Sequence, residues 1–289
     1  MTGQRPGRTG KIANVLTIAG SDSGGGAGIQ ADLKTMSALG TYGLSVITAL
    51  TAQNTRSVTT IHDAPPDMIA AQLDAIFDDI RIDAVKIGML SRPEVIEVVA
   101  DRLRCHDVKW IVLDPVMVAK SGDALLQPDA VSALITHLLP LASVITPNLP
   151  EAGVLLNREQ PDDVRSMRSA VGDLRSLGPK AVLLKGGHLL EGDAVDLFDD
   201  GKTCDELRGA RILTKNTHGT GCTLSAAIAA LLGQGYGLHA AVKMSKDYVG
   251  RAIAAADMLD VGQGHGPVHH FHALWPVFDN VVTDQETDR

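Results

Sequence analysis

The sequence predicts a layered α/β fold in which helices cover both faces of a mostly parallel sheet. Short apolar runs bounded by Gly, Pro, Asp or Asn alternate along the chain with longer segments whose apolar residues recur at helical spacing. A strand, a helix and a second strand in this order form a parallel pair through a right-handed crossover, which places helices on the sheet faces. The 289 residues, 45% of them apolar, are enough for one large core.

The elements follow in order along the chain. Buried strands are expected at Val15–Ala19, Leu44–Leu50, Ala84–Ile87, Trp110–Leu113, Ser143–Thr146 and Ala181–Leu184. Helices are expected from near Ile29 and over Pro66–Ile80, Pro93–Arg104, Ala130–Leu139 and Val164–Leu177. Two shorter strands, Ala194–Asp199 and Arg208–Leu213, then precede two Ala-rich helices, Thr220–Leu232 and Leu238–Leu259. We expect a single domain over residues 15–275, between a flexible N-terminal tail, 1–14, and a C-terminal tail, 276–289.

The charge of the chain limits its partners. A formal net charge of −8 argues against a broad surface for nucleic acid or anionic membrane, because both need a positive field. The 3 cysteines form no zinc or redox spacing, and an odd count suits a reducing compartment. No apolar run has the length of a signal peptide core or a membrane span. We therefore expect a cytoplasmic protein that binds neither nucleic acid nor membrane.

A first glycine-rich loop, Ile18–Gly28, joins the first strand to the first helix. Such a turn lets the backbone approach a ligand closely and can aim amide groups at it from a helix start. The loop is not a Walker A motif, because no Gly-Lys-Ser/Thr follows, and it is not a clean dinucleotide fingerprint. A plain tight turn explains the glycines equally well.

A second glycine-rich loop, Thr217–Cys222, stands directly before the helix that starts near Thr220. The backbone N–H groups of Gly219, Thr220, Gly221 and Cys222 can form an anion-binding concavity, to which the helix dipole adds positive potential. This is a place for phosphoryl charge to develop. Its position at the helix N-terminus is expected to lower the pKa of the Cys222 thiol, although an inert buried thiol is the commoner fate of a lone cysteine.

Polar residues follow three of the predicted strands. Asp114 ends one strand, Asn148 and Glu151 follow the next, and Lys185 ends a third. Ligands of open parallel sheets bind outside the carboxyl ends of the strands, so we expect these side chains to converge there. Asp114, Asn148 and Glu151 suit Mg²⁺, and Lys185 suits a nucleotide phosphate. The alternatives are a turn at Asp114, a helix cap at Asn148 and Glu151, and a solvated lysine.

At this point the motifs resemble a known family. The segments that carry the resemblance are Leu16–Lys34, Ser45–Asn54, Leu113–Met117, Thr146–Glu151, Lys185–His188, Asn216–Ser225 and the late Gly262–Pro267. In this order they resemble the motifs of the hydroxymethylpyrimidine/phosphomethylpyrimidine kinases, which belong to the ribokinase-like superfamily. The chain departs from the common pattern at Ser23–Gly26 and Met36, and neither departure removes a group to which we assign a catalytic role.

The resemblance implies a three-layer α/β/α ribokinase-like domain, often a homodimer. It implies phosphorylation of 4-amino-5-hydroxymethyl-2-methylpyrimidine, and then of its monophosphate, with ATP and Mg²⁺ in thiamine diphosphate biosynthesis. It further implies that the residue at Gln53 binds the pyrimidine and that Cys222 holds the general-base position. The residues implied as the lining of the same pocket are Gly20, Ala27, Asp32, Met89 and Val116. Two alternatives stay open, a pyridoxal or pyridoxine kinase of vitamin B6 salvage and a pyrimidine-binding sensor without catalysis.

Overall fold

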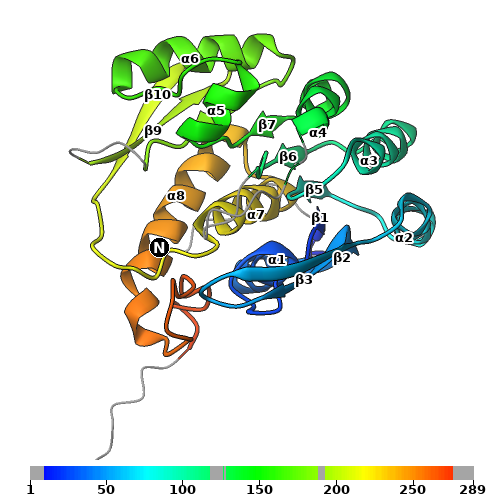
Figure 1. The fold of residues 1–289 in the computed structure, drawn as a ribbon, viewed down its shortest axis with the longest axis horizontal. Coiled ribbons are helices and arrows are strands. Elements are labelled where there is room, and N and C mark those ends of the chain that lie inside the picture. Colours follow the sequence, from blue (N-terminus) through cyan, green and yellow to red (C-terminus); the bar gives the residue numbers. More distant parts are fainter. Residues whose placement is uncertain (1–9, 118–125, 127, 188–192, 276–289) are drawn as a thin grey trace, which may run out of the picture.

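The computed structural model describes residues 10–117, 126, 128–187 and 193–275. Its centre is an eight-stranded sheet with helices on both faces (Figure 1). Residues 1–9 of the expected N-terminal tail and the whole expected C-terminal tail, 276–289, lie outside the described residues. The first strand begins at Asn14, the last residue of the expected N-terminal tail, and the preceding Ala13 is already buried.

The main sheet has the strand order β10-β9-β8-β7-β6-β5-β1-β2. Its strands are β1 (Asn14–Ala19), β2 (Tyr42–Ile47), β5 (Ala84–Ile87), β6 (Ile111–Leu113), β7 (Val144–Ile145), β8 (Val182–Leu184), β9 (Ala194–Asp199) and β10 (Cys204–Gly209). Only the pairs β8–β9 and β9–β10 of this described sheet are antiparallel. The expected mostly parallel sheet is therefore confirmed.

Two apolar cores lie on opposite faces of the sheet. The first face is covered by α2 (Pro66–Asp79), α3 (Pro93–Cys105), α4 (Pro128–Ala133, continued by short π and 3-10 segments, Leu134–Leu138 and Leu139–Leu141), α5 (Leu149–Leu155) and α6 (Val164–Ser176). The other is covered by α1 (Gly28–Ala38), α7 (Thr220–Gly233) and α8 (Leu238–Ala254), followed by a 3-10 turn, Ala256–Met258. The helix α7 is buried along most of its length, which explains its Ala-rich sequence.

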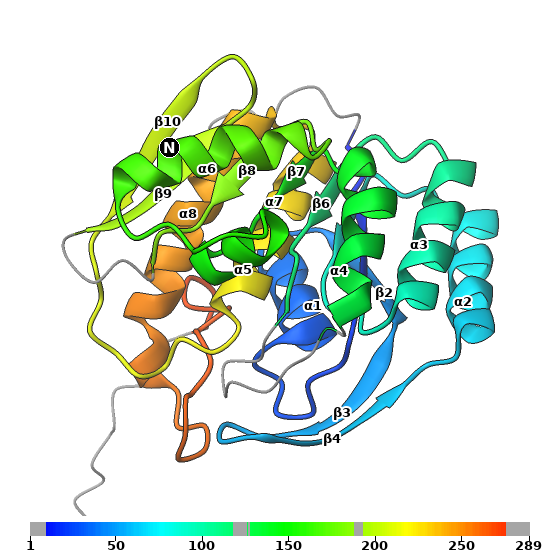
Figure 2. The ribbon, with the colours of Figure 1, turned by 45° about the horizontal axis from the view of Figure 1, so that its top comes forward.

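A two-stranded ribbon, β3 (Ala49–Gln53) and β4 (Val58–Asp63), leaves the main sheet. Figure 2 shows it running along one edge of the molecule beside α1. The sequence predicts one strand over Leu44–Leu50, but the chain turns out of the sheet at Thr48. There the Thr48 amide donates to the Ala19 carbonyl at 3.0 Å and its hydroxyl donates to the Met89 carbonyl at 2.9 Å. The apolar pattern continues through this turn, so it carries no sign of the break.

The prediction of a strand over Arg208–Leu213 is wrong in position, because β10 occupies Cys204–Gly209. A tight turn sets this register: Asp200 Oδ1 accepts hydrogen bonds from the Lys202 and Thr203 amides, both at 2.9 Å. The strand that follows must start at once, opposite Asp199. Its polar, half-exposed sequence is that of an edge strand, which alternation of apolar residues does not reveal.

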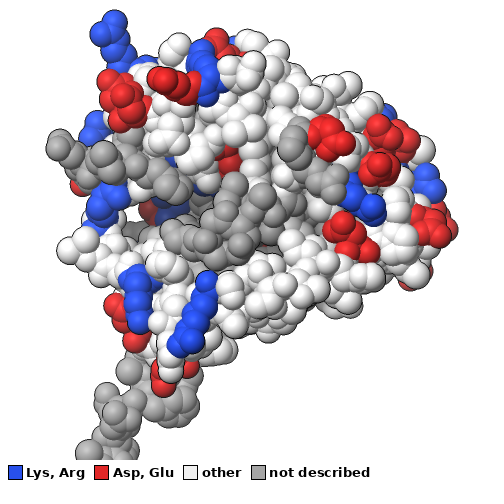
Figure 3. Space-filling model, viewed as in Figure 1, with Lys and Arg blue, Asp and Glu red and all other residues white. Residues whose placement is uncertain are grey.

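The surface carries charged side chains of both signs. Acidic and basic side chains are interspersed over the face shown in Figure 3. Among the described helices, none combines the length and the apolar character that a membrane crossing requires.

Candidate active site

The carboxyl ends of β6 and β8 bring Asp114 and Lys185 together. Lys185 Nζ lies 2.9 Å from Asp114 Oδ1, and the Asp114 side chain is almost fully buried. The Thr146 hydroxyl donates to the same oxygen at 2.9 Å. The expected convergence of Asp114 and Lys185 at this end of the sheet is thus seen directly.

This buried pair is charged. Burial alone would raise the pKa of Asp114, but the ammonium groups of Lys185 and Lys86 outweigh it and hold that pKa below its ordinary value. Burial likewise opposes the charge of Lys185, while the carboxylates of Asp114 and Glu151 raise its pKa. The site therefore presents a fixed cation beside a fixed anion.

Asn148 and Glu151 form a capping box at the start of α5. The Glu151 amide donates to Asn148 Oδ1 at 2.8 Å, and the Asn148 amide donates to Glu151 Oε2 at 2.7 Å. Burial, with a further contribution from the charge of Asp114, raises the pKa of Glu151 to about 7. The helix-cap alternative is therefore present in the fold.

The capping box leaves room for a metal role. Glu151 Oε1 takes no part in the box, and a divalent cation would stabilise the carboxylate whose ionisation burial opposes. Over the described residues, no three His, Cys, Asp or Glu side chains form a complete protein cage for a metal. Two carboxylates without a cage fit Mg²⁺, which keeps waters and nucleotide phosphates as its other ligands.

The N-terminus of α7 lies over the Asp114–Lys185 pair. A Cβ built on Gly221 would be 3.2 Å from Lys185 Nζ and 3.4 Å from Asp114 Oδ2. Within the described part of the chain, the Gly221 and Cys222 amides have no hydrogen-bond acceptor, whereas the Thr220 amide donates to the Thr217 carbonyl at 3.3 Å. The start of α7, with these two N–H groups, therefore lies beside the Lys185 ammonium.

The expected lowering of the Cys222 pKa is wrong. Burial raises the pKa of this thiol to about 11, and the carboxylates of Asp32 and Asp114 add to the rise. The Lys86 ammonium and a hydrogen bond from the Gly28 amide offset this only in part. Desolvation of the thiolate therefore outweighs the favourable helix end.

The first glycine-rich loop wraps around a carboxylate of its own. Asp22 accepts hydrogen bonds from the amides of Gly24 at 2.8 Å, Gly26 at 3.1 Å and Ala27 at 2.8 Å. It also lies 2.8 Å from His218 Nε2 in the second loop. Of the two alternatives left open for this loop, these three amides follow the tight turn: they hold Asp22, which ties the two loops together.

The residues expected around the pyrimidine lie near these loops. Gly20 faces Met89, because a Cβ on Gly20 would overlap the Met89 methyl group. Ala27 stands at the start of α1, and Val116 is partly exposed two residues beyond Asp114. Asp32 differs: it is fully buried and accepts hydrogen bonds from Thr17 at 2.6 Å and Lys86 at 2.8 Å, beneath the loops.

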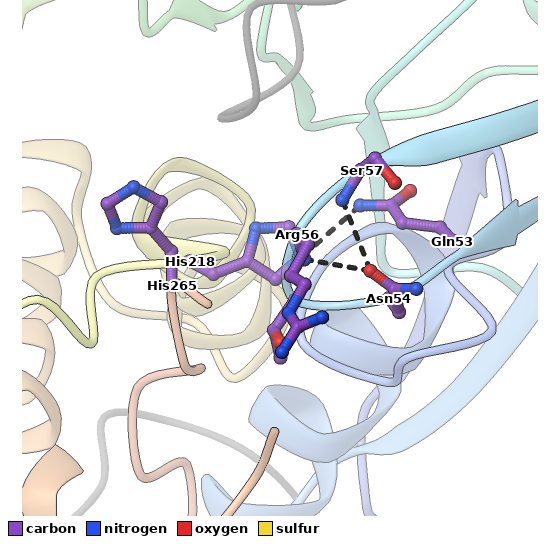
Figure 4. Close-up of a pocket in the computed structure, with 7 residues that line it drawn as sticks. Gln53, Asn54, Arg56, Ser57, His218 and His265 are labelled. Atoms are coloured by element: carbon purple, nitrogen blue, oxygen red, sulfur yellow. Dashed lines mark hydrogen bonds between the residues drawn. The ribbon is translucent and has the colours of Figure 1, made fainter. Parts of the chain in front are cut away.

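Gln53 comes from the end of β3 on the ribbon. Its backbone carbonyl and amide both bond the Ser23 hydroxyl at 2.8 Å, which fastens the ribbon to the first glycine-rich loop. Its side-chain amide lies 3.4 Å from His218. Figure 4 shows the small pocket formed by the ribbon tip, Gln53 to Ser57, with His218 and His265.

The comparison with known proteins identifies the family. A family model described as "Phosphomethylpyrimidine kinase" matches residues 22–269. The chain belongs to this family. The hydroxymethylpyrimidine/phosphomethylpyrimidine kinase of Rhizobium meliloti (strain 1021) is 59% identical to it over 263 residues, 91% of this chain and 98% of that protein.

Solved structures agree with this assignment. A phosphomethylpyrimidine kinase from Clostridium difficile 630 is 48% identical, with a TM-score of 0.75, over 84% of this chain and 100% of that one. A Bacillus subtilis pyridoxal kinase, solved as an ADP complex, is 38% identical, with a TM-score of 0.85, over 91% of this chain and 99% of that one. The expected family and the three-layer ribokinase-like fold are confirmed.

Sequence reasoning missed three residues of this phosphomethylpyrimidine kinase family site. Lys86 is the one charged residue in the otherwise apolar strand β5. A lysine in a buried strand indicates a buried ion pair, so this residue could have been found from the sequence. Asp22 and His218 lie within the two glycine-rich loops, whose glycines indicated contacts of the backbone and not a pair of side chains. Their pairing across 196 residues of chain has no local signature.

Proposed function

We propose that this kinase transfers the γ-phosphoryl group of ATP to 4-amino-5-hydroxymethyl-2-methylpyrimidine, and then to the monophosphate, in thiamine biosynthesis. The observation that carries the proposal is the start of α7, where free amides at Gly221 and Cys222 meet the Lys185 ammonium. Phosphoryl transfer depends mainly on positioning and on stabilisation of developing negative charge. These groups would supply that stabilisation.

The acidic residues near Lys185 would hold the metal ion that accompanies the nucleotide. Asp114 and Glu151, with Asn148 holding the Glu151 helix start, would bind Mg²⁺. The metal, when bound, neutralises charge on the nucleotide phosphates. Lys185 stays ionised beside Asp114 and faces the same place, so it would bind a transferring phosphate oxygen.

The substrate side is formed by Gln53 with Gly20, Ala27, Met89 and Val116. A carboxamide presents a donor and an acceptor side by side, which complements the edge of an aminopyrimidine. The apolar Met89 methyl group lies against Gly20, where a side chain would have no room, and would pack against the ring. Asp32, which the family resemblance also places in this pocket, is fully buried and paired with Lys86.

Replacing Gln53 with Leu is expected to raise KM for the pyrimidine at least about 10-fold and to leave KM for ATP unchanged. The change removes both hydrogen-bonding atoms and keeps a side chain of similar size. Steady-state kinetics with each substrate varied in turn measure both constants. An unchanged pyrimidine KM would exclude Gln53 from the binding site.

Replacing Cys222 with Ala is expected to slow the first phosphorylation more than the second. The hydroxymethyl group must lose a proton, whereas a phosphate monoester is already largely ionised at pH 7. Because burial raises the pKa of Cys222 to about 11, its thiolate increases as pH rises toward that value. The first step should therefore accelerate with pH in the unaltered protein and less so in Cys222→Ala. Single-turnover rates of each step measure this, and equal losses in both steps contradict the assignment.

We propose a cytoplasmic homodimer. Exposed apolar side chains on β2 and the ribbon, Tyr42 at 61% and Leu50 at 53%, offer surface that a second copy would cover.

A second candidate is a pyridoxal kinase, favoured by the likeness to the Bacillus subtilis pyridoxal kinase. Pyridoxal also carries a hydroxymethyl group on a substituted heteroaromatic ring. Initial rates with pyridoxal and with the pyrimidine, at equal concentration and saturating Mg-ATP, decide between them. We expect the pyrimidine to be preferred, and a higher rate with pyridoxal would reverse the assignment. Ligand binding without any turnover would indicate a sensor.

A further inference from the structure

The backbone that carries Lys185 lies at the end of a strand ladder. On the β7 side, the Lys185 amide donates to the Pro147 carbonyl at 2.8 Å. On the β9 side, the antiparallel ladder of β8 ends at the pair Leu184–Leu197, one residue before Lys185. Lys185 and the following Gly186 therefore lie beyond the backbone pairing with β9.

The side chain of Asp196, in β9, holds the chain where this ladder stops. Its Oδ1 accepts a hydrogen bond from the Gly186 amide at 3.0 Å. Gly186 is buried, so its N–H group would be costly to leave without an acceptor. A Cβ on Gly186 would overlap the Val195 carbonyl oxygen, so the backbone lies directly against β9 at this point. Asp196 thus fixes the backbone immediately after Lys185.

Lys246, on α8, holds the Asp196 carboxylate in this orientation. Lys246 Nζ lies 2.7 Å from Asp196 Oδ2 and also donates to the Ala194 carbonyl at 3.1 Å. The two side chains are largely buried, with 16% of Lys246 and 11% of Asp196 exposed. Each carboxylate oxygen of Asp196 therefore has a donor of its own, the Gly186 amide on one side and the Lys246 ammonium on the other.

We propose that Asp196, oriented by Lys246, is a positioning residue for Lys185 in phosphoryl transfer. The inference rests on the proposed function, because it concerns the lysine assigned there to a phosphate oxygen. Lys185 Nζ lies 2.9 Å from Asp114 Oδ1 and 3.2 Å from a Cβ built on Gly221, so a shift of its backbone would move the ammonium away from both. Phosphoryl transfer depends on such placement, and a displacement of about 1 Å can cost about 100-fold in rate.

The same strand offers a matched control at Asp199. Its Oδ1 accepts a hydrogen bond from the Gly201 amide at 2.6 Å and lies 3.5 Å from Arg175 Nε. Asp199 stands opposite Val182, at the end of β8 away from Lys185. Asp199→Ala therefore removes a carboxylate that holds a glycine amide and a cation, as Asp196→Ala does, but leaves the backbone beside Lys185 in place.

The test measures kcat and the pyrimidine KM for the first phosphorylation. Asp196→Ala should lower kcat at least about 10-fold and keep the pyrimidine KM within about 3-fold, because the ammonium acts on the transferring phosphate and not on the ring. Asp199→Ala should keep kcat within about 2-fold. Asp196→Asn combined with Lys246→Gln removes both charges and keeps an acceptor for the Gly186 amide, so it should keep kcat within about 3-fold.

A double-mutant cycle separates positioning of Lys185 from mere anchoring of α8 to the sheet. In the Lys185→Ala background, Asp196→Ala should not lower kcat further, because the ammonium that it positions is absent. An equal loss in both backgrounds, an unchanged kcat in Asp196→Ala, or an unchanged kcat in Lys185→Ala overturns the proposal.

A milder variant decides if Asp196→Ala does not fold. In Asp196→Asn alone, the Lys246 ammonium attracts the amide oxygen, which turns the NH2 group toward the Gly186 N–H. The kcat of this variant should therefore fall, and an unchanged kcat overturns the proposal. Failure of the inference alone leaves the unaltered protein active. If the unaltered protein does not phosphorylate the pyrimidine, the proposed function fails, and the inference with it.

Discussion

Gly219→Ala is expected to lower kcat/KM for phosphoryl transfer by at least about 100-fold. Gly219 caps the N-terminus of α7 with a φ of 76°, a conformation that L side chains rarely adopt. A Cβ at this position would also overlap the backbone carbonyl oxygen of Gly26 in the other glycine-rich loop. Backbone cannot yield as a flexible side chain can, so the two loops must move apart and displace the free amides of Gly221 and Cys222.

Gly250→Ala is the matched control for this change. Gly250 lies in α8, and nothing lies within 4 Å of a Cβ built there. The control should keep full activity, while Gly219→Ala should lose it, as measured by steady-state kinetics at saturating Mg-ATP. Activity of Gly219→Ala within a few-fold of the unaltered protein would show that the two loops are not held in contact.

Lys86→Met is expected to destabilise the protein by about 3–5 kcal/mol, because it leaves a buried carboxylate without its cation. Lys86 and Asp32 are both fully buried and lie 2.8 Å apart. Asp32 Oδ2 also accepts the Thr17 hydroxyl, and its Oδ1 has no hydrogen-bond partner among the residues that the structure describes. Without the Lys86 ammonium, the Asp32 carboxylate therefore keeps only the hydrogen bond from Thr17 to compensate its burial.

Urea unfolding at pH 7 measures this loss. The control is Lys86→Met combined with Asp32→Asn, which removes both charges and keeps an acceptor for Thr17. It should recover most of the stability, because replacing a whole buried pair is close to neutral. A loss below about 1 kcal/mol in Lys86→Met alone would mean that Asp32 is not an uncompensated anion.

The fold was predictable where the periodic pattern and the tertiary structure agree. The alternating apolar runs and helical segments lead to the order of the elements, and the helices Pro66–Asp79 and Pro93–Cys105 end within one residue of the prediction. The ribbon was missed because the turn at Thr48 depends on hydrogen bonds to Ala19 and Met89, which are distant in the sequence. The register of β10 was missed because an edge strand needs no apolar alternation.

The candidate site was predictable where strand ends determine it. Asp114 follows β6 and Lys185 follows β8, and only β7 lies between these two strands in the sheet. The ion pair between the two side chains therefore follows from the order of the strands. The pKa of Cys222 was predicted in the wrong direction, because the sequence shows the helix start but not the burial that outweighs it. The link from Asp22 to His218 depends on how two loops pack, which neither loop reveals by itself.

The central claim is tested most directly by a mass-resolved time course of the purified protein with Mg-ATP and 4-amino-5-hydroxymethyl-2-methylpyrimidine, beside a parallel reaction with pyridoxal. The account predicts that the monophosphate appears first and is then converted to the diphosphate. Formation of pyridoxal phosphate alone, or no phosphorylated product despite demonstrated binding of the pyrimidine, would contradict it.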